Sequence, residues 1–264
     1  MLNDSEKNKR RIALVGAGNV ATSLALALQN AGETIVAVWS RSNESAMLLG
    51  KRLECSFTTE IELLPDADIV IITVTDTALP AVARDVAKHY PKALVVHTAG
   101  SIPMSLLYES GFKYYGVFYP MQTFSKARIV DFSTVSLFVE ACNKEALEML
   151  KSLAGKLTDK VYSVTSEQRR YLHLAAVFAC NFVNASYSMA AELLEQNGLP
   201  FDAMLPLIDE TARKVHNLQP RDAQTGPAQR GDNTVMSQQR ELLDEDFRRV
   251  YDIMSEYIQK NRHI

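Results

Sequence analysis

The chain has 264 residues, of which 47% are hydrophobic and 22% are charged, and its formal net charge is −3. This composition excludes a disordered chain, and the lack of a basic excess argues against generic nucleic-acid binding. At roughly 150 residues per domain, the length predicts about two domains. The cysteines Cys55, Cys142 and Cys180 are too scattered for a disulfide framework or a zinc motif. Free thiols favour a cytoplasmic location, and the polar start predicts no signal peptide.

The first half of the chain alternates strand and helix patterns. Apolar runs predict strands at 11–15, 34–39, 68–74, 93–97, 114–119, 135–140 and 160–164. Helical patterns lie between them at 19–31, 43–52, 60–64, 77–89 and 143–154. Several strands are nearly continuous apolar runs, which are typical of a parallel sheet covered on both faces. The alternation predicts a doubly wound α/β domain of the Rossmann type over residues 1–162. Asp76 is expected to cap the helix after the third strand.

The second half of the chain is predicted to be all-helical. Thr165 and Gln168 fit a capping box, and the helix that follows runs to Gln196, before an Asn197–Gly198 stop. More helix is expected at 201–216, briefly within 220–240, and at 240–260. These patterns predict a helical domain over 163–264, with the boundary between residues 160 and 166.

The long helix contains an apolar stretch that raises the question of a membrane span. No Asp, Glu, Lys or Arg occurs from Tyr171 to Ala191, a length that permits a span. His173, Asn181 and Asn184 lie inside the stretch, however, and such polar groups are costly in hydrocarbon. We therefore expect no membrane segment, but a buried central helix that packs within its domain and against a second subunit. Arg169 and Arg170, early in this helix, are expected to be solvated.

A glycine motif between the first strand and the first helix predicts a dinucleotide site. Gly16, Gly18 and Ala21 allow, in turn, a tight turn, close approach of the backbone to a pyrophosphate, and close helix packing. The start of the helix then offers free N–H groups and the positive end of its dipole. The predicted contacts to the cofactor are Gly16, Ala17, Gly18, Asn19 and Val20. The alternative is a strand–helix turn without a ligand.

The end of the second strand distinguishes NADP(H) from NAD(H). Proteins that bind NAD usually carry an acid about 20 residues after the motif, but here the strand ends in Ser40, Arg41 and Ser42. Arg41 can hold a 2′-phosphate through charge-assisted hydrogen bonds, and both serines can donate as well. We therefore predict NADP(H); the alternative is that Arg41 is an ordinary surface residue.

Two later strand ends are expected to line the same crevice, because ligands bind outside the carboxyl ends of such strands. The first carries Val74, Thr75 and Asp76, which we place at the adenosine or ribose side. The second carries His97, Thr98 and Ala99, where a nicotinamide ring is expected. His97 either donates to a substrate carbonyl as a catalytic residue or merely caps its strand.

Four motifs give the chain a resemblance to a bacterial family of NADP oxidoreductases. They are GAGNVA at 16–21, HTAGSIP at 97–103, YPMQTFS at 119–125 and TGPAQRGD at 225–232, and together they extend over nearly the whole chain. That family joins a Rossmann-like domain to a helical domain of unknown function. It is similar to pyrroline-5-carboxylate reductase, ketopantoate reductase and the 3-hydroxyacid dehydrogenases.

The resemblance implies architecture and cofactor more than a substrate. It implies NADP(H), a C-terminal domain like that of 6-phosphogluconate dehydrogenase, and a homodimer formed through the helices. The chain departs from the family's pattern at Tyr119, where His is more usual. If Tyr119 contacts the substrate, a proton donor there is a phenol.

Candidate reactive groups in the helical half are His173, Asn181 and Arg230. In the hydroxyacid and ketopantoate enzymes a Lys and Asn residues on the central helix face the nicotinamide, but this helix has no lysine. His173 and Asn181 are spaced by just over two α-helical turns, which predicts a shared face. His173 can move a proton and Asn181 can orient a substrate oxygen, or both are core polar groups. Arg230 either binds an anionic substrate group or pairs with a nearby acid such as Asp232.

These observations predict an oxidoreductase that transfers a hydride between NADP(H) and a small C=O or C=N substrate in an interdomain cleft. The missing lysine leaves a second hypothesis, a non-catalytic sensor or scaffold that binds NADP(H). No metal site, nucleic-acid partner or membrane partner is expected.

Overall fold

The structure is a computed structural model that describes residues 9–262, so most of the polar start lies outside the described residues. The chain divides into two compact units, Met1–Cys180 and Asn181–Ile264. The division falls inside the long helix, later than the boundary expected between residues 160 and 166.

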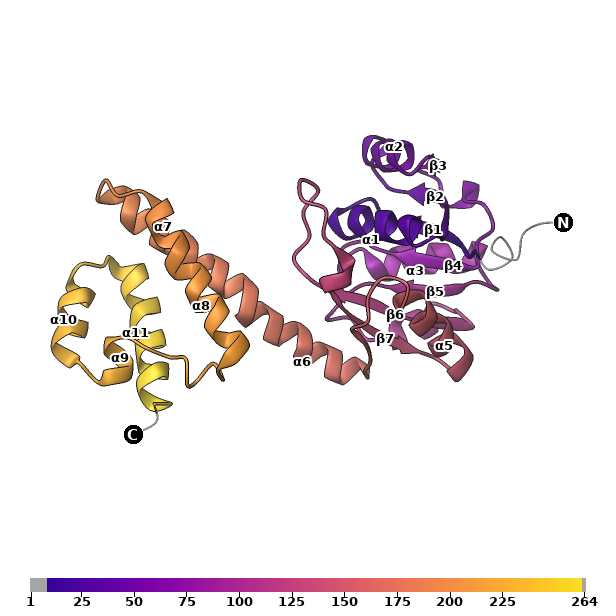
Figure 1. The fold of residues 1–264 in the computed structure, drawn as a ribbon. Helices are drawn as coiled ribbons and strands as arrows, with labels where there is room; N and C mark the ends of the chain where they lie inside the picture. The colour runs from indigo at the N-terminus through magenta and orange to yellow at the C-terminus, as the bar shows by residue number, and fades with distance from the viewer. Residues whose placement is uncertain (1–8, 263–264) are drawn as a thin grey trace. The chain divides into compact units, whose positions relative to one another are not determined.

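The first unit alternates strands and helices, as the sequence predicts (Figure 1). Its strands are β1 Arg11–Val15, β2 Thr34–Trp39, β3 Ser56–Thr58, β4 Ile69–Ile72, β5 Leu94–His97, β6 Tyr114–Met121, β7 Ser136–Ala141 and β8 Val161–Ser163. Its helices are α1 Asn19–Asn30, α2 Asn43–Arg52, α3 Leu79–His89, α4 Ser105–Glu109, α5 Lys144–Ala154 and α6 Ser166–Ala176, with 3₁₀ turns at Ile61–Leu63 and Phe132–Thr134. Every predicted strand is present, whereas β3 and α4 were not predicted.

The strands form one sheet in the order β3-β2-β1-β4-β5-β6-β7-β8. The strands from β3 to β6 are all parallel. β7 pairs antiparallel with β6, and β8 is parallel to β7. A parallel neighbour requires a crossover, usually a helix, but β6 and β7 are joined by an irregular segment with only a 3₁₀ turn. The Rossmann-type doubly wound fold is confirmed, with a switch point where β1 lies between β2 and β4.

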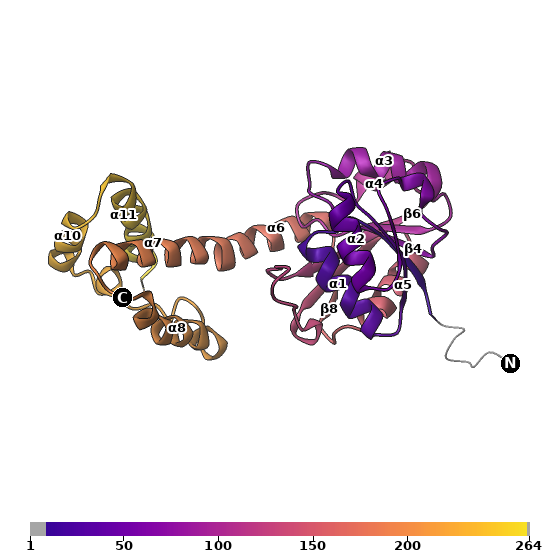
Figure 2. The ribbon, with the colours of Figure 1, turned by 90° about the horizontal axis from the view of Figure 1, so that it is seen from above.

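Helices cover both faces of the sheet. Alternate residues of β1 point to opposite faces, so that Ile12 and Leu14 join one buried cluster and Ala13 and Val15 join another. Helices α1, α2 and α5 contribute to the first cluster, and α3 and α4 to the second, as Figure 2 shows from above. This double burial explains the continuous apolar runs, and it directs the carboxyl ends of the strands to one edge.

The second unit is helical, as predicted. A π-helical segment, Val177–Phe182, continues α6 and is followed by α7 Val183–Gln196. The remaining elements are a 3₁₀ turn at Phe201–Met204, α8 Leu205–Asn217, α9 Pro227–Arg230, α10 Asn233–Glu241 and α11 Glu245–Lys260. The capping box of Thr165 and Gln168 is present at the start of α6. Gly231 ends α9 in the left-handed conformation that glycine adopts readily.

The apolar stretch of the long helix is not buried by the described part of the chain, which corrects the expectation that it packs inside its domain. The continuous helix Ser166–Gln196 contains an 18-residue apolar window, none of which is buried. By length and composition alone this helix is sufficient to cross a membrane. Across residues 181–262, only Ala228 and Ser255 are buried. The helix itself follows the predicted pattern, but no residue among those the structure describes covers its apolar window.

Candidate active site

The turn after β1 has the geometry that the glycine motif predicts. Gly16 adopts φ +128°, and its N–H donates to the Trp39 carbonyl at 2.8 Å. A Cβ atom at Gly16 would lie 2.5 Å from Thr73 Oγ1, whereas one at Gly18 would meet no atom within 4 Å. Gly18 is the N-cap of α1; it forms no side-chain cap, and no acid lies in the first turn. The helix start is therefore open to an anion, and only glycine fits the turn itself.

These two glycines allow a matched test of the turn. Gly16→Ala is expected to destabilise the fold by about 1–3 kcal/mol, because it forces a side chain into a strained φ and against Thr73. Gly18→Ala should leave the melting temperature unchanged, because the added methyl group meets no protein atom. It should weaken NADPH binding, because the methyl group occupies the space in which we expect the pyrophosphate. Thermal unfolding and NADPH titration of both variants measure the two effects. Equal losses of stability would contradict this account of the turn.

Arg41 lies just after β2, and its side chain is not engaged by the rest of the described chain. The Ser40 N–H donates to the Thr58 carbonyl at 3.2 Å, and Ser42 caps α2 by accepting from the Ser45 N–H at 3.3 Å. Arg41 is exposed, and within residues 9–262 its side chain forms no hydrogen bond or ion pair. Its guanidinium is therefore available to an external anion, and β3 supports the turn that presents it.

The turns after β4 and β5 are joined by a side-chain hydrogen bond. Ser101 Oγ donates to the carboxylate of Asp76. Asp76 was expected to cap the following helix, but α3 begins at Leu79 with Ala78 as an uncapped N-cap. The cap prediction is wrong because the carboxylate binds the neighbouring turn instead. Its bond holds the segments Val74–Asp76 and His97–Ala99 beside each other at the carboxyl edge of the sheet.

His97 is fully buried, and its ring serves the turn rather than the solvent. Its Nδ1 accepts a hydrogen bond from the Ala99 N–H at 3.2 Å. Burial lowers the pKa of His97 to about 3, with the nearby Arg169 charge acting in the same direction and the Pro103 carbonyl opposing both. The ring is therefore neutral near pH 7. The bond to Ala99 fits the strand-cap alternative. His97 Nε2 is buried without a hydrogen-bond partner among the described residues, and the catalytic alternative stays a prediction.

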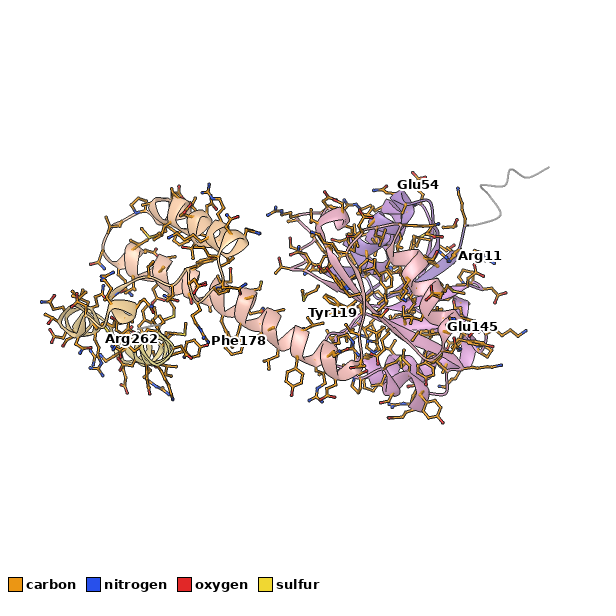
Figure 3. All side chains as sticks on the ribbon, turned by 60° about the horizontal axis from the view of Figure 1, so that its bottom comes forward. Arg11, Glu54, Tyr119, Glu145, Phe178 and Arg262 are labelled. Carbon is orange, nitrogen blue, oxygen red and sulfur yellow. The ribbon has the colours of Figure 1, made fainter. Side chains whose placement is uncertain are left out.

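Tyr119 and His173 form a pair that the sequence did not predict. Tyr119 Oη on β6 lies 3.1 Å from His173 Nδ1 on α6, so this contact joins the strand to the helix. Figure 3 labels Tyr119 where α6 meets the sheet. The imidazole rests on the backbone of Gly100, where a Cβ atom would lie 2.5 Å from Nδ1. Burial raises the pKa of Tyr119; Arg169 opposes this effect and Asp76 adds to it. The phenol thus retains its proton at neutral pH.

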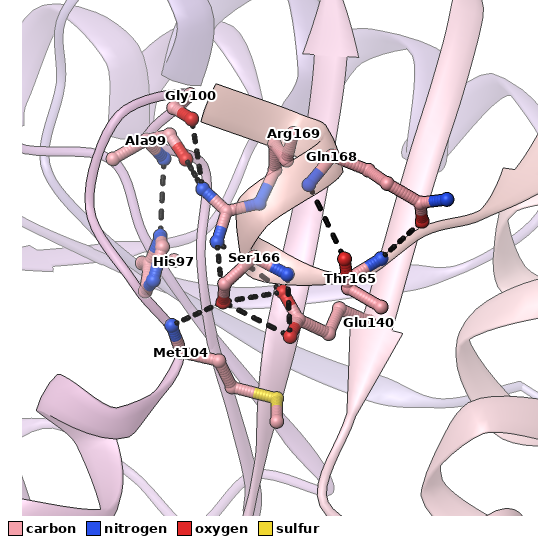
Figure 4. Close-up of polar contacts among 9 residues, drawn as sticks. All are labelled: His97, Ala99, Gly100, Met104, Glu140, Thr165, Ser166, Gln168 and Arg169. Atoms are coloured by element: carbon pink, nitrogen blue, oxygen red, sulfur yellow. Dashed lines mark hydrogen bonds and ion pairs between the residues drawn. The ribbon is translucent and has the colours of Figure 1, made fainter. Parts of the chain in front are cut away.

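Arg169 is fully buried, which corrects the expectation that it is solvated. Its Nη1 donates to the carbonyl oxygens of Ala99 and Gly100 at 2.8 and 2.9 Å (Figure 4). Its Nη2 donates to Glu140 Oε2 at 3.3 Å and to Ser166 Oγ at 3.2 Å. A buried charge is tolerated where it is paired and hydrogen-bonded in this way.

The other two predicted reactive residues lie in the second unit. Asn181 is exposed within the π-helical segment, so its spacing from His173 is not purely α-helical, and their shared face stays a prediction. Arg230 is exposed on α9, and in the described part of the chain its side chain forms no hydrogen bond or ion pair. The alternative pairing with Asp232 is not formed; Asp232 Oδ1 instead accepts from the Val235 N–H as the N-cap of α10. Arg230 therefore remains available, and its contact with a substrate stays a prediction.

Comparison with known proteins identifies the family. One family model, described as NADP oxidoreductase coenzyme F420-dependent, matches residues 11–100, and a domain of unknown function (DUF2520) matches 135–258. A crystal structure of a putative NADP oxidoreductase from Bacteroides fragilis is 48% identical over 96% of this chain and 98% of its own, with a TM-score of 0.90. The chain belongs to the NADP oxidoreductase family. It is an NADP-dependent oxidoreductase, as the sequence motifs predicted.

More distant structures share the fold of this oxidoreductase. An imine reductase from Myxococcus stipitatus, solved in complex with NADP⁺, is 18% identical over 95% of this chain and 93% of its own, with a TM-score of 0.70. A pyrroline-5-carboxylate reductase from Coxiella burnetii is 17% identical over 97% of this chain and all of its own, with a TM-score of 0.61. No curated protein matches the sequence.

Proposed function

We propose that this oxidoreductase transfers a hydride between NADP(H) and a small C=O or C=N compound, and that Tyr119 and His173 move the accompanying proton. The observation that carries the proposal is the 3.1 Å contact between Tyr119 Oη and His173 Nδ1. It lies at the carboxyl edge of the sheet that bears the glycine turn, where ligands of such folds bind. The cofactor, when bound, supplies or accepts the hydride.

The turns at the sheet edge fit the cofactor. We place its pyrophosphate at the start of α1, against the backbone from Gly16 to Val20, because a Cβ atom at Gly18 would meet only open space. We place the 2′-phosphate beside Arg41, whose guanidinium is unused by the fold, with Ser40 and Ser42 as further donors. The adenosine and ribose then pass Val74, Thr75 and Asp76, and the nicotinamide lies by the backbone from His97 to Ala99.

The paired phenol and imidazole can exchange a proton in either direction. If Tyr119 Oη donates to His173 Nδ1, the imidazole carries its proton on Nε2. It can give that proton to a substrate oxygen or nitrogen while Nδ1 takes the hydroxyl proton of Tyr119, so that the imidazole stays neutral and the phenol becomes a phenolate. If Nδ1 carries the proton instead, Tyr119 accepts it and can donate its own hydroxyl proton. Asn181 would orient a substrate oxygen, and Arg230 would bind an anionic substrate group. These two roles rest on residue chemistry alone.

A screen of two substrate classes tests the reaction. The likeness in fold to an imine reductase and a pyrroline-5-carboxylate reductase favours cyclic imines, and 2-oxo acids represent the C=O class. We expect NADPH consumption with at least one class and its loss in His173→Ala. A protein that binds NADPH but reduces neither class would overturn the proposal in favour of a non-catalytic NADP(H)-binding sensor or scaffold.

We also propose that the enzyme is a homodimer in which a second copy covers the helical half. Among residues 181–262 only Ala228 and Ser255 are buried, and large apolar side chains such as Leu207 and Ile253 are more than 60% exposed. Folded units of this size are held together chiefly by burial of apolar surface. His173, Asn181 and Asn184 favour a protein partner over a lipid bilayer, because they can form hydrogen bonds across a helical interface.

Charge substitution on the long helix tests the dimer. Ala185 is exposed in the apolar stretch, so Ala185→Arg places a charge in the proposed interface without disturbing contacts inside the chain. We expect sedimentation analysis to show a dimer for the natural protein and a weakened dimer for this variant. Gln196→Arg, at the end of the same helix, is the matched control and should remain dimeric. A natural protein that sediments as a monomer would contradict the proposed assembly.

A further inference from the structure

The buried guanidinium of Arg169 is a feature that the proposed reaction leaves unexplained. Its planar fork spans two carbonyl oxygens, a hydroxyl and a carboxylate, while its Nε has no partner among the described residues. Replacing a buried ion pair with apolar groups of similar volume is often neutral or stabilising. Stability alone therefore does not account for an arginine at this position. The place of Arg169 beside Tyr119 and His173 suggests a role in their geometry.

Arg169 and His173 act on the same piece of backbone. They lie four residues apart on α6, so their side chains share one face, one turn apart. Arg169 Nη1 holds the carbonyl oxygens of Ala99 and Gly100. The imidazole of His173 rests directly on Gly100, where even a methyl group would collide with it. The guanidinium thus fixes the surface against which the imidazole packs.

A second set of bonds anchors the same turn of α6 to β7. Glu140 accepts from the Ser166 N–H at 2.9 Å and from Ser166 Oγ at 2.8 Å, besides its ion pair with Arg169 at 3.3 Å. Ser166 Oγ in turn accepts from the Met104 N–H at 3.0 Å. Figure 4 shows these contacts converging on the first turn of the helix. Helix α6 is thereby locked to β7 and to the segment after β5 at once.

We propose that Arg169 is a positioning residue that sets the imidazole of His173 at its working distance from Tyr119. The guanidinium holds the Ala99–Gly100 backbone on which the imidazole packs. Glu140 holds the first turn of α6, the helix that carries His173. Arg169 itself is fully buried, so its side chain offers no exposed surface to a substrate or cofactor. Its loss should therefore impair the proton step while sparing cofactor binding. The catalytic part of this inference rests on the proposed function, whereas the placement of the imidazole does not.

The experiment compares three variants. Arg169→Lys keeps the charge opposite Glu140 but loses the fork. The double variant Arg169→Met with Glu140→Met removes both charges together, so that no unpaired buried charge threatens folding. Arg170→Lys is the control, because Arg170 is the exposed neighbour on the same helix. Circular dichroism and thermal unfolding first establish that each variant is folded.

The imidazole is then observed directly, without any substrate. The protein has five histidines, and the ring nitrogen signals of His173 are assigned by their disappearance in His173→Gln. We expect the ring signals of His173 to shift, with mixed tautomers, in both Arg169 variants and to stay unchanged in the control. Unchanged ring signals in the folded double variant would overturn the positioning role.

Kinetics provide the second measurement. Because a displacement of about 1 Å can cost roughly 10²-fold in rate, we expect kcat to fall about that much in the double variant, with a smaller loss in Arg169→Lys. KM and the Kd for NADPH should each change less than about threefold. A weakened Kd for NADPH with unchanged kcat and unchanged ring signals would overturn the inference. Shifted ring signals with unchanged turnover would uphold the positioning role and overturn the proposed function instead.

Discussion

Replacing His173 with alanine is expected to lower kcat by roughly 10²- to 10⁴-fold, the usual contribution of a positioned acid or base. The reason is its 3.1 Å contact with Tyr119, which links two groups able to hold the transferred proton. NADPH affinity should change little, since the imidazole lies on α6 rather than on the glycine turn. Steady-state kinetics with the best substrate from the screen, together with NADPH titration, measure both quantities.

The control for this prediction is His216→Ala, which removes an exposed histidine from α8 and should leave turnover unchanged. Tyr119→Phe removes only the hydroxyl and should also lower kcat, because the imidazole loses its partner. If His173→Ala retains full turnover, the imidazole is a structural group and the proton must come from elsewhere.

Replacing Arg41 with alanine is expected to weaken NADPH binding by about ten- to a hundredfold, the effect of losing charge-assisted hydrogen bonds worth roughly 1.5–3 kcal/mol. NADH lacks the 2′-phosphate, so its affinity should stay the same. Titration calorimetry with each cofactor measures the difference, which should shrink at high salt because Arg41 is exposed.

Arg52→Ala provides the matched control for Arg41, because it removes an exposed arginine from the last turn of α2. It should leave both affinities unchanged. Equal losses of NADPH and NADH binding in Arg41→Ala would show that Arg41 supports the turn after β2 rather than the phosphate.

The sheet could be predicted from the sequence because its strands are buried on both faces and therefore appear as continuous apolar runs. β3 was missed because its three residues, Ser56–Thr58, form an edge strand without a buried residue. The antiparallel direction of β7 was also beyond prediction. Strand direction depends on the connection from β6, and an apolar run looks the same in either direction.

The glycine turn was predictable because its residues are adjacent in sequence, whereas the reactive pair depends on distant contacts. Tyr119 and His173 are separated by 54 positions. Arg169 meets Gly100 across 69 positions and Glu140 across 29. Without these partners a charged residue in a helix is expected to face solvent, which is why Arg169 was misplaced. The one local signal was its spacing of four residues from His173.

In the helical half, the helices were predictable from the sequence but the burial of their apolar faces was not. Its helices follow from the sequence period and from caps such as Thr165 and Asp244. The apolar stretch after Tyr171 suggested burial, but burial depends on what lies opposite the helix. No part of the described chain buries that window, so a sequence pattern can identify an apolar face without showing which molecule covers it.

Deuterium transfer from NADPH labelled at the nicotinamide C4 position tests hydride transfer most directly. The natural protein is incubated with labelled NADPH and the panel of cyclic imines and 2-oxo acids, and the products are analysed by mass spectrometry. We predict one deuterium at the carbon of the former C=N or C=O bond, from only one of the two C4 epimers of the labelled cofactor. Absence of a reduced product, or a reduced product without deuterium from either epimer, would contradict the proposed reaction.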